Sequence, residues 1–312
     1  MTTIGFIGLG AMGGRMAGRL LDAGYEVHGT NRTAAKAAPL IERGLRWHDT
    51  PREVAGAAQI TFSMVADDTA LHGIMTGPDG LLADMSPGHI HVDMSTVSPQ
   101  VSREFAELAR AIGAELLDTP VSGSIPAARD GSLSIMAAGD EAAFHQVEPL
   151  LRELGRTVTY IGANGQALLL KLAINVSLSA QILALSEGVL LAERGGIDRK
   201  LAMDVMSGSA IGSPAVHARA PMILDLPEQA WFDVALMQKD IRLALHAGYA
   251  LGAPLPSADL ADSLLAQASN LGYAHRDIAA LFQVLAHTSA TRERHGGPAR
   301  RSRGARLQAE HA

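Results

Sequence analysis

The sequence contains no cysteine in its 312 residues. This absence excludes disulfides, thiol nucleophiles and metal sites built on thiolates. Aromatic residues are scarce as well, at 4% of the chain, so a core must be built mainly from Ala, Leu, Ile, Val and Met. Because hydrophobic residues still make up 47% of the chain, we expect enough buried surface for one large domain or two domains.

The chain also lacks an excess of positive charge and a targeting segment. Its net charge is −6, which argues against nucleic acid as the main partner. The N-terminal residues MTTIGFIGLGAMGG lack the basic start of a signal peptide. The apolar run Leu168–Leu191 has the length of a membrane span, but it contains Lys171, Asn175, Gln181 and Glu187. We therefore expect a soluble cytoplasmic protein with no membrane partner and no specific nucleic-acid partner.

The start of the chain carries a glycine motif in an α/β setting. The β-type run Thr3–Ile7 leads directly into Gly8–Gly13, then into the helical segment Arg15–Ala23 and a second strand, Tyr25–Gly29. This order of strand, glycine turn, helix and strand within about thirty residues is the setting of the dinucleotide-binding fingerprint. The pattern predicts a Rossmann domain, with a doubly wound and mostly parallel sheet, over residues 1–163.

The glycines of this motif have separate physical roles. Gly8 permits the tight turn, Gly10 lets the backbone approach a pyrophosphate, and Gly13 lets the helix pack on the strand. The helix N-terminus adds free N–H groups and a positive dipole end. The cofactor-binding residues predicted in this turn are Gly8, Leu9, Gly10, Ala11, Met12 and Gly13.

The end of the second strand predicts which nicotinamide cofactor is bound. An acidic residue there would bind the ribose 2′-hydroxyl of NAD. This chain has Asn31, Arg32 and Thr33 instead. A guanidinium pairs with a 2′-phosphate and stacks on adenine, while Asn and Thr add neutral hydrogen bonds. The sequence therefore predicts NADP(H) over NAD(H); the alternative is that Arg32 is only a solvated loop charge.

Two more apolar strands end where the cofactor crevice is expected. Ala58–Val65 is followed by Ala66, and the backbone at the C-terminal end of such a strand commonly edges the cofactor crevice. We interpret Asp67 and Asp68 as helix N-caps rather than catalytic acids.

The strand His89–Met94 is followed by polar residues. Either Thr96 or Ser98 can cap the next helix, and the functional interpretation places Thr96 beside the nicotinamide. His89 and His91 point the same way on this strand, but the sequence offers no third ligand, so we expect no metal site.

A further strand, Glu115–Val121, leads into Ser122, Gly123 and Ser124, and the strand Leu133–Ala137 follows. Ser and Gly after a strand expose hydroxyls and backbone N–H groups, which suits a substrate carboxylate. An ordinary turn has the same composition, and the spacing does not distinguish the two interpretations.

The second half of the chain is organised around a long apolar helix, predicted between Gly165 and Gly195 without an internal proline. Lys171 and Asn175 lie four residues apart and therefore share a face of it. A lysine buried in an apolar wall needs a partner or a task; alternatively, Lys171 extends its amine to the surface.

The β signals nearly vanish after this helix. We predict an interdomain helix over residues 164–195, an all-α domain over 196–290 and a disordered basic tail over 291–312, where six arginines occur. In the all-α region, Lys239 and Asp240 form a charged pair in an apolar helix, which could equally be a partly exposed ion pair of little energetic value.

Four motifs, in order, resemble the β-hydroxyacid dehydrogenase family. They are GFIGLGAMG near the start, DTPVSGSIPAARDGSLSIMAAG at Asp118–Gly139, the helix with Lys171 and Asn175, and FDVALMQKD at Phe232–Asp240. This family includes 3-hydroxyisobutyrate dehydrogenases, tartronate semialdehyde reductases and glyoxylate/succinic semialdehyde reductases. The resemblance covers roughly residues 3–288 and implies a 6-phosphogluconate dehydrogenase-like C-terminal domain.

The resemblance implies a role for each site residue. Lys171 is similar to the catalytic lysine that exchanges a proton with the substrate oxygen, and Asn175 to a substrate-positioning amide. Ser122 and Gly123, with Ser124 in place of a frequent glycine, are similar to the carboxylate-binding segment. Further cofactor contacts are implied for Val65, Ala66, Thr96 and Lys239, and Asn31, Arg32 and Thr33 resemble the NADP-using branch. Ala167 and Ile174 also depart from the common pattern, which affects the substrate's identity.

We therefore expect an NADP(H)-dependent oxidoreductase that acts on a small β-hydroxyacid or its semialdehyde. An imine reductase-like activity is the enzymatic alternative, because that related family shares the architecture. A non-catalytic NADP-binding module is the alternative of another class; the presence of Lys171, Asn175, Ser122 and Gly123 together disfavours it. The long apolar helix also predicts a homodimer or homotetramer.

Overall fold

A computed structural model describes residues 2–295. Contacts between residues divide the chain into two compact units. Unit 1 comprises Met1–Leu178 and Ala235–Asp262, and unit 2 comprises Ser179–Val234 and Ser263–Ala312. Each unit is described separately below.

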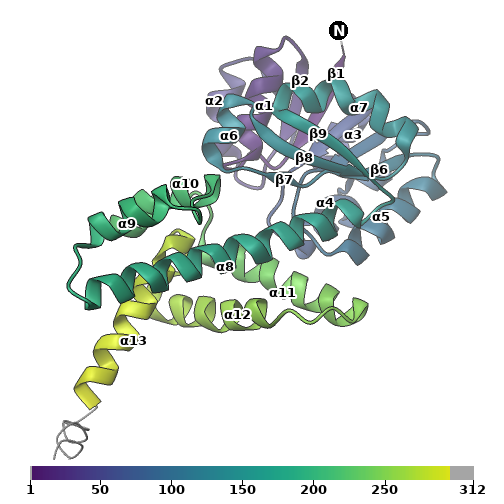
Figure 1. The fold of residues 1–312 in the computed structure, drawn as a ribbon. Coiled ribbons are helices and arrows are strands. Elements are labelled where there is room, and N and C mark those ends of the chain that lie inside the picture. Colours follow the sequence, from purple (N-terminus) through teal and green to yellow (C-terminus); the bar gives the residue numbers. More distant parts are fainter. Residues whose placement is uncertain (1, 296–312) are drawn as a thin grey trace, which may run out of the picture. The chain divides into compact units, whose positions relative to one another are not determined.

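Unit 1 is built on a nine-stranded sheet in the described residues, with the order β3-β2-β1-β4-β5-β6-β8-β7 and with β9 paired to β8 (Figure 1). The strands are β1 (Thr3–Ile7), β2 (Glu26–Thr30), β3 (Arg46–Trp47), β4 (Ile60–Ser63), β5 (Ile90–Asp93), β6 (Glu115–Asp118), β7 (Val121–Ser122), β8 (Leu133–Ala138) and β9 (Gly155–Gly162). Neighbours from β3 to β6 are parallel, and β8 runs antiparallel to β6 and β7. The expected doubly wound, mostly parallel sheet is confirmed.

Helices cover both faces of this sheet. One face packs through Phe6, Phe62 and Val92 against α1 and α7, and the other packs through Ile7 and Leu116 against α3, α4 and α5. Burial on both faces explains why these strands are nearly continuous apolar runs. The helices of this region are α1 (Gly13–Asp22), η1 (Ala34–Ala37), α2 (Ala38–Ile41), α3 (Pro51–Ala57), α4 (Asp68–Thr76), η2 (Leu81–Ala83), α5 (Pro99–Ala111), α6 (Ile125–Asp130) and α7 (Glu141–Leu154).

The helix starts follow the expected capping chemistry. The Asp67 side chain accepts a hydrogen bond from Ala70 N, which makes it the N-cap of α4. Ser98 caps α5 by accepting from Gln100 N, and Pro99 occupies the first turn. The prediction of Asp67 as a capping residue is thereby confirmed, whereas Asp68 is the first residue of α4 and its side chain accepts a hydrogen bond from Ser98 N. Ser98 rather than Thr96 caps α5.

The predicted single strand Glu115–Val121 is wrong, because the structure divides it. β6 ends at Asp118 and β7 begins at Val121, with Thr119 and Pro120 between them. Proline has no backbone N–H to donate to a ladder, and the chain changes strand partner from β5 and β8 to β8 alone at this point. This break places Ser122 at the end of the separate strand β7.

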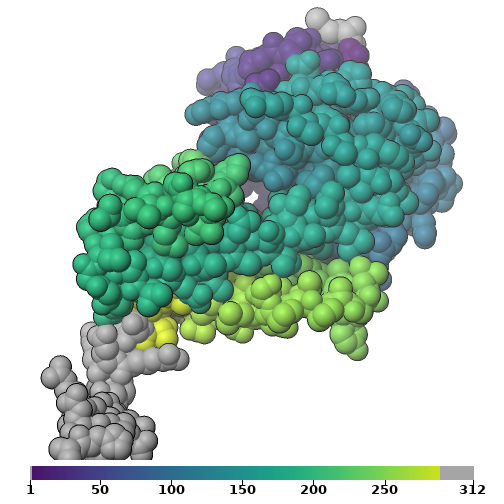
Figure 2. Space-filling model, in the orientation of Figure 1, coloured from purple at the N-terminus to yellow at the C-terminus, as the bar shows by residue number. Residues whose placement is uncertain are grey.

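The long central helix α8 spans Gln166–Arg194, as the sequence predicts. Its length and apolar composition alone would let it cross a membrane, but a core helix of a soluble protein meets the same criterion. It is only partly buried, since Leu191 exposes 76% of its surface. Its first half, with Lys171 and Asn175, belongs to unit 1 together with most of α11 (Val234–Leu251). Figure 1 labels both helices, and Figure 2 shows the α11 segment in light green.

Unit 2 is helical. It contains the second half of α8, α9 (Arg199–Gly208), α10 (Pro214–Leu224), the end of α12 (Pro256–Ala268), a π-helical turn (Ser269–Tyr273), η4 (Ile278–Ala280) and α13 (Leu281–His295). Its core includes Leu185, Met203, Val216 and Phe282.

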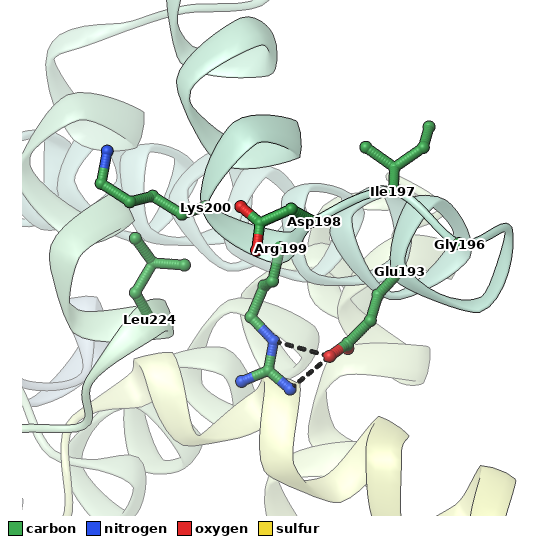
Figure 3. Close-up of a pocket in the computed structure, with 7 residues that line it drawn as sticks. All are labelled: Glu193, Gly196, Ile197, Asp198, Arg199, Lys200 and Leu224. Atoms are coloured by element: carbon green, nitrogen blue, oxygen red, sulfur yellow. Dashed lines mark hydrogen bonds and ion pairs between the residues drawn. The ribbon is translucent and has the colours of Figure 1, made fainter.

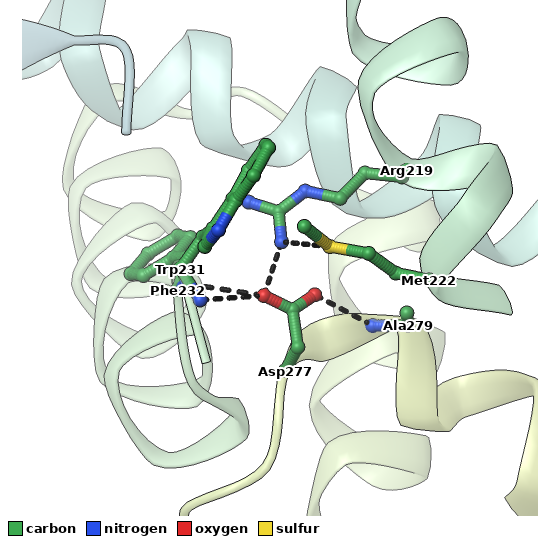
Figure 4. Close-up of polar contacts among 6 residues, drawn as sticks. All are labelled: Arg219, Met222, Trp231, Phe232, Asp277 and Ala279. Atoms are coloured by element: carbon green, nitrogen blue, oxygen red, sulfur yellow. Dashed lines mark hydrogen bonds and ion pairs between the residues drawn. The ribbon is translucent and has the colours of Figure 1, made fainter. Parts of the chain in front are cut away.

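A buried ion pair joins separate parts of unit 2 (Figure 4). Arg219 on α10 pairs with Asp277, and the two side chains are 4% and 0% exposed. Asp277 Oδ2 also accepts hydrogen bonds from the backbone N–H groups of Trp231 and Phe232, and Oδ1 accepts one from Ala279 N. One carboxylate therefore fixes the segment before α11 against η4.

The predicted domain boundaries at residues 163 and 195 lie next to the ends of α8, and the boundary at 290 falls within α13. The compact units instead divide α8 and give residues 235–262 to unit 1. The boundaries stay a prediction. Helix α13 extends to His295, and the predicted tail beyond that residue lies outside the described part of the chain.

Candidate active site

The glycine turn lies where the order of the sheet reverses, between β1 and β4. Gly8 has φ of +92°, and a Cβ there would overlap the backbone carbonyl of Met64 after β4. A Cβ on Gly13 would overlap the carbonyl of Gly8, so this glycine lets α1 begin against the turn. Gly10 is exposed, and a Cβ there would meet open space. Crevices at such a point are where doubly wound sheets bind ligands.

This turn fits the pyrophosphate of a dinucleotide. Gly10 and Ala11 are exposed, and α1 follows them without an acidic residue in its first turn. Free N–H groups and the dipole of α1 therefore meet no competing carboxylate. Leu9 is buried and Met12 is partly buried, so these two side chains anchor the turn.

Asn31 links two turns at the predicted adenosine end of the crevice. Its Oδ1 accepts a hydrogen bond from Leu9 N at 3.0 Å, and its Nδ2 donates to Thr33 O at 2.9 Å. The amide thus ties the turn after β1 to the turn after β2. Arg32 and Thr33 follow with exposed side chains. Asn31 is a structural link in this arrangement, and its direct contact with a cofactor stays a prediction.

The turns after β4 and β5 form the next part of the crevice edge. Val65 N donates a 2.9 Å hydrogen bond to Ser95 Oγ, so the two turns are joined. Ala66 is exposed and Thr96 is partly buried beside them. The structure therefore brings three predicted cofactor contacts, Val65, Ala66 and Thr96, into one edge.

Lys239 connects α11 to this edge. Its amine donates to the backbone carbonyl of Thr96 and lies 2.9 Å from Asp240 Oδ1. Asp240 is buried, and its Oδ2 accepts a 2.6 Å hydrogen bond from Asn175 Nδ2 on α8. The interpretation of Lys239 and Asp240 as a partly exposed pair is therefore wrong for Asp240, because α8 covers its carboxylate.

Lys171 lies within the electrostatic field of the same group. Burial lowers the pKa of its amine to about 8, while the charge of Asp240 raises this pKa and that of Lys239 lowers it. Burial likewise raises the pKa of Asp240, and Lys239, Lys171 and Asn175 lower it. A lysine that titrates near neutral pH can both donate and accept a proton under working conditions. The cluster is thus chemically suited to proton transfer.

The start of α8 is anchored by a residue that sequence reasoning did not assign. Asp118 at the end of β6 is fully buried, and its Oδ1 accepts from Gly165 N at 2.8 Å and from Ser102 Oγ at 3.1 Å. Its Oδ2 accepts from Leu168 N at 3.4 Å. A carboxylate at a helix N-terminus satisfies free N–H groups and opposes the positive dipole end. Asp118 therefore fixes the register of the turn that carries Lys171.

The predicted carboxylate-binding segment is built by β7 and α6. Ser122 ends β7 opposite Ser134 of β8, and Gly123 has φ of +123°, which favours glycine. A Cβ on Gly123 would lie 2.9 Å from that of Ala127. Ser124 then occupies the N-cap position of α6. Exposed backbone next to a helix start suits an anion, and binding of substrate there stays a prediction.

The structure places every predicted site residue in unit 1. Hydrogen bonds and ion pairs join two groups, the Leu9–Asn31–Thr33 link and the Thr96–Lys239–Asp240–Asn175 chain. Sequence reasoning missed Asp118 and Ser95, which position these groups. The sequence pattern that could have indicated them is weak, because each is only a small polar residue at or just after the carboxyl end of a buried strand.

A separate hollow in unit 2 contains none of the predicted site residues (Figure 3). It lies where α8 ends and α9 begins. Arg199, on its wall, pairs with Glu193 at 2.7 Å and lies over the ring of Phe282. The hollow's one guanidinium is therefore already engaged, and we assign no ligand to it. Its remaining lining residues are Gly196, Ile197, Asp198, Lys200 and Leu224.

Family models match both halves of the chain. Residues 3–162 match the NAD binding domain of 6-phosphogluconate dehydrogenase. Residues 164–285 match a model described as NAD-binding of NADP-dependent 3-hydroxyisobutyrate dehydrogenase.

Individual proteins are similar over nearly the same range. 2-Hydroxy-3-oxopropionate reductase of Escherichia coli (strain K12) is 35% identical over 282 residues, which cover 90% of this chain and 96% of that protein. Cytokine-like nuclear factor N-PAC of Homo sapiens is 32% identical over 91% of this chain, but the chain spans only about half, 51%, of its length. The solved structure of Mycobacterium tuberculosis 3-hydroxyisobutyrate dehydrogenase with L-serine has a TM-score of 0.81 at 30% identity, covering 91% of this chain and 99% of that chain.

Proposed function

This chain belongs to the β-hydroxyacid dehydrogenase family, and on that premise we propose that it transfers hydride between NADP(H) and a small 3-hydroxyacid or its semialdehyde. The observation that carries the proposal is the environment of Lys171. Its pKa is lowered to about 8 beside Asp240, which in turn holds Asn175 and Lys239. The family's oxidoreductase chemistry needs a group of this kind at the reacting oxygen.

Lys171 acts as the general acid and base. In the direction of reduction, its ammonium donates a proton to the carbonyl oxygen as that oxygen gains negative charge, and the charge of the ammonium stabilises the developing alkoxide. In the direction of oxidation, the neutral amine removes the hydroxyl proton. The nicotinamide ring, when bound, supplies or accepts the hydride. Burial lowers the pKa of Lys171, and the charge of Asp240 opposes this effect in part.

Two features support a substrate that carries a carboxylate and a hydroxyl. The Ser122–Ser124 segment offers hydroxyls and exposed backbone before α6. The Oδ1 atom of Asn175 is buried without a hydrogen-bond partner in residues 2–295, so the amide has an acceptor left for a substrate hydroxyl. Because the similar enzymes are named for a hydroxyisobutyrate and a hydroxy-oxopropionate, we place the substrate in this size class.

We propose NADP(H) as the preferred cofactor. Arg32 and Thr33 are exposed at the end of β2, next to the Asn31 link, where a 2′-phosphate would lie. The match to an NADP-dependent dehydrogenase model supports the same preference. We further propose that the protein is cytoplasmic and that it forms a homodimer or homotetramer. The proposal of an oligomer follows from exposed apolar side chains, which include Leu191, Ile197, Leu201 and Val205.

The deciding experiment compares wild type with Lys171→Ala. Oxidation of NADPH is followed with glyoxylate, succinic semialdehyde, methylmalonate semialdehyde and cyclic imines as acceptors. We expect turnover with a semialdehyde, and a loss of about 100-fold or more in the variant with nearly unchanged NADPH affinity. Turnover of imines alone would favour an imine reductase instead. A wild-type protein that binds NADPH but reduces none of these acceptors would support a non-catalytic module.

A further inference from the structure

A continuous file of buried polar side chains runs along strands β4 and β5. It starts at His89 and passes through Thr61, His91 and Ser63 to Asp93 and Ser95, each at most 1% exposed. The successive contacts are His89 Nε2 to Thr61 Oγ1 at 2.9 Å, Thr61 Oγ1 to His91 Nδ1 at 2.9 Å, His91 Nε2 to Ser63 Oγ at 3.0 Å, and Ser63 Oγ to Asp93 Oδ1 at 2.6 Å. We refer to these six residues as the polar file.

The sheet register explains why these side chains meet. Thr61 lies opposite His91 and Ser63 lies opposite Asp93 in the parallel pairing of β4 with β5. Because side chains two residues apart share a face, the polar residues of both strands fall in one row. The apolar residues between them, Phe62, Ile90 and Val92, belong to the core on the opposite face. Desolvation is costly for this row unless every member is hydrogen-bonded.

The file ends at the predicted cofactor crevice. Asp93 Oδ1 also accepts from Ser95 Oγ at 2.6 Å and from Ser95 N at 3.2 Å. Ser95 Oγ in turn accepts from Val65 N at 2.9 Å. The hydroxyl of Ser95 therefore connects Asp93 to the turn after β4, and its own backbone leads into Thr96. The charged group that acts on Asp93 is Lys239, which holds the carbonyl of Thr96.

When Asp93 is ionised, the number of available protons determines which atom donates in each hydrogen bond of the polar file. The single hydroxyl proton of Ser63 is donated to Asp93, so Ser63 Oγ accepts from His91, which carries its proton on Nε2. His91 Nδ1 then accepts from Thr61, whose Oγ1 accepts from Nε2–H of His89. His89 Nδ1 is left as a bare acceptor. This agrees with its lack of a hydrogen-bond partner in the described residues.

We propose that the polar file positions the cofactor crevice, with His91 as a positioning residue that acts through Ser63, Asp93 and Ser95 on the turns at Val65 and Thr96. The proposal rests on the proposed function only in taking NADP(H) as the ligand of that crevice. Each donated hydrogen bond fixes the rotamer of the next side chain. Ser95, whose hydroxyl is held by Asp93, in turn fixes the position of the Val65 backbone by accepting from its N–H. Removing the Nε2–H of His91 frees Ser63 to rotate and releases Asp93 from one of its donors.

Burial also keeps the histidines neutral, which the direction of the file requires. It lowers the pKa of His89 to about 4, and burial together with the charge of His89 lowers that of His91 to about 3. Burial raises the pKa of Asp93 above its usual value, and the hydrogen bonds of Ser63 and Ser95 and the charge of Lys239 limit that rise. The ionised form of Asp93 is therefore the form that its donors favour.

Two substitutions of His91 distinguish an effect of its hydrogen bond to Ser63 from an effect of side-chain packing. The amide nitrogen of His91→Gln reaches the place of imidazole Nε2 and can donate to Ser63, whereas the shorter side chain of His91→Asn cannot. We expect His91→Asn to raise the Kd of NADPH about 10-fold, and His91→Gln to stay within about 3-fold of wild type. The KM for NADPH should rise with little change in kcat at saturating cofactor. Equal NADPH affinity in His91→Asn and wild type would overturn the proposal.

A second measurement needs no variant and no substrate. Long-range ¹H–¹⁵N spectra of the wild-type imidazoles should show His89 and His91 in the neutral Nε2–H tautomer near pH 7. A His91 that carries its proton on Nδ1 would contradict the direction of the file and overturn the proposal, even if no variant folds. Failure of the proposed function is separate, because it would appear as a wild-type protein that reduces none of the semialdehydes, whereas NADPH affinity and the histidine tautomers are measured without any substrate.

Discussion

Asn175 Nδ2 donates a 2.6 Å hydrogen bond to Asp240 Oδ2, which joins α8 to α11 over 65 residues of sequence. The same carboxylate pairs with Lys239 through its other oxygen. Asp240 therefore holds the amide, contacts the lysine that reaches Thr96, and acts by its charge on Lys171. One buried carboxylate therefore interacts both with the proposed proton-transfer group, Lys171, and with Lys239, which contacts the cofactor edge at Thr96.

The first prediction concerns the pH dependence of the reaction. Because the pKa of Lys171 is lowered to about 8, its ammonium form dominates below that pH and its neutral form above it. Reduction needs the acid, so kcat/KM for the aldehyde should be constant at lower pH and fall as pH rises through about 8. Oxidation of the hydroxyacid needs the base and should rise through the same pH. Steady-state rates in both directions measure these profiles.

Asp240→Asn provides the control for that profile. The charge of Asp240 raises the pKa of Lys171, so removing it should move the break in both profiles to lower pH. The amide retains a hydrogen-bond acceptor for Asn175 Nδ2. An unchanged break in Asp240→Asn would show that the titrating group is not Lys171 in this environment.

The second prediction distinguishes two glycines of the same turn. Gly10→Ala places a methyl group in open space, so stability should be retained, but the methyl stands where the pyrophosphate approaches and should weaken NADPH binding about 10-fold. Gly13→Ala forces a Cβ into the carbonyl of Gly8 and should destabilise the fold by about 1–3 kcal/mol. Thermal unfolding and NADPH titration separate the two effects. Equal loss of stability in both variants would refute the assignment of roles.

The third prediction tests the choice of cofactor. Arg32→Ala should raise the Kd of NADPH about 10-fold or more and leave that of NADH nearly unchanged, because only NADPH carries the 2′-phosphate. Arg152→Ala, an exposed arginine on α7 that pairs with Glu148, is the matched control for loss of one positive charge. Fluorescence titration of both nucleotides is the measurement. A parallel loss for NADH would contradict a 2′-phosphate contact by Arg32.

The sequence was sufficient for features that depend on local pattern. Glycines at three positions directly after a strand predict the glycine turn, and an apolar run without proline from Gln166 to Arg194 predicts α8. The cap at Asp67 could be predicted for the same reason, since capping involves residues only three positions apart.

Features that depend on pairing across the chain could not be predicted in this way. The contact of Asn175 with Asp240, the anchoring of α8 by Asp118 and the link from Asn31 to Leu9 each join segments at least 22 residues apart. The polar file shows the limit clearly. The sequence places His89 and His91 on one face of a strand, but only the register with β4 brings Thr61 between them and Ser63 between His91 and Asp93.

The fourth prediction concerns the stability of unit 2. Asp277→Ala removes the ion partner of buried Arg219 and three backbone hydrogen bonds, to Trp231, Phe232 and Ala279. Losing one partner of a buried pair typically costs about 3–5 kcal/mol, so the variant should unfold at a clearly lower urea concentration. Trp231 lies beside the pair and makes the transition visible by fluorescence, although the signal of Trp47 must be subtracted.

The control for Asp277 is Asp204→Ala on α9, which breaks an exposed pair with Lys200. Solvent screens such pairs, so its unfolding midpoint should match that of wild type. The two variants remove the same charge from the same unit and differ in burial. If both shifted the midpoint equally, the loss would follow from net charge, and Asp277 would not be the residue that secures the segment before α11 against η4. If only Asp277→Ala shifts it, the burial of the carboxylate and its backbone donors is the cause.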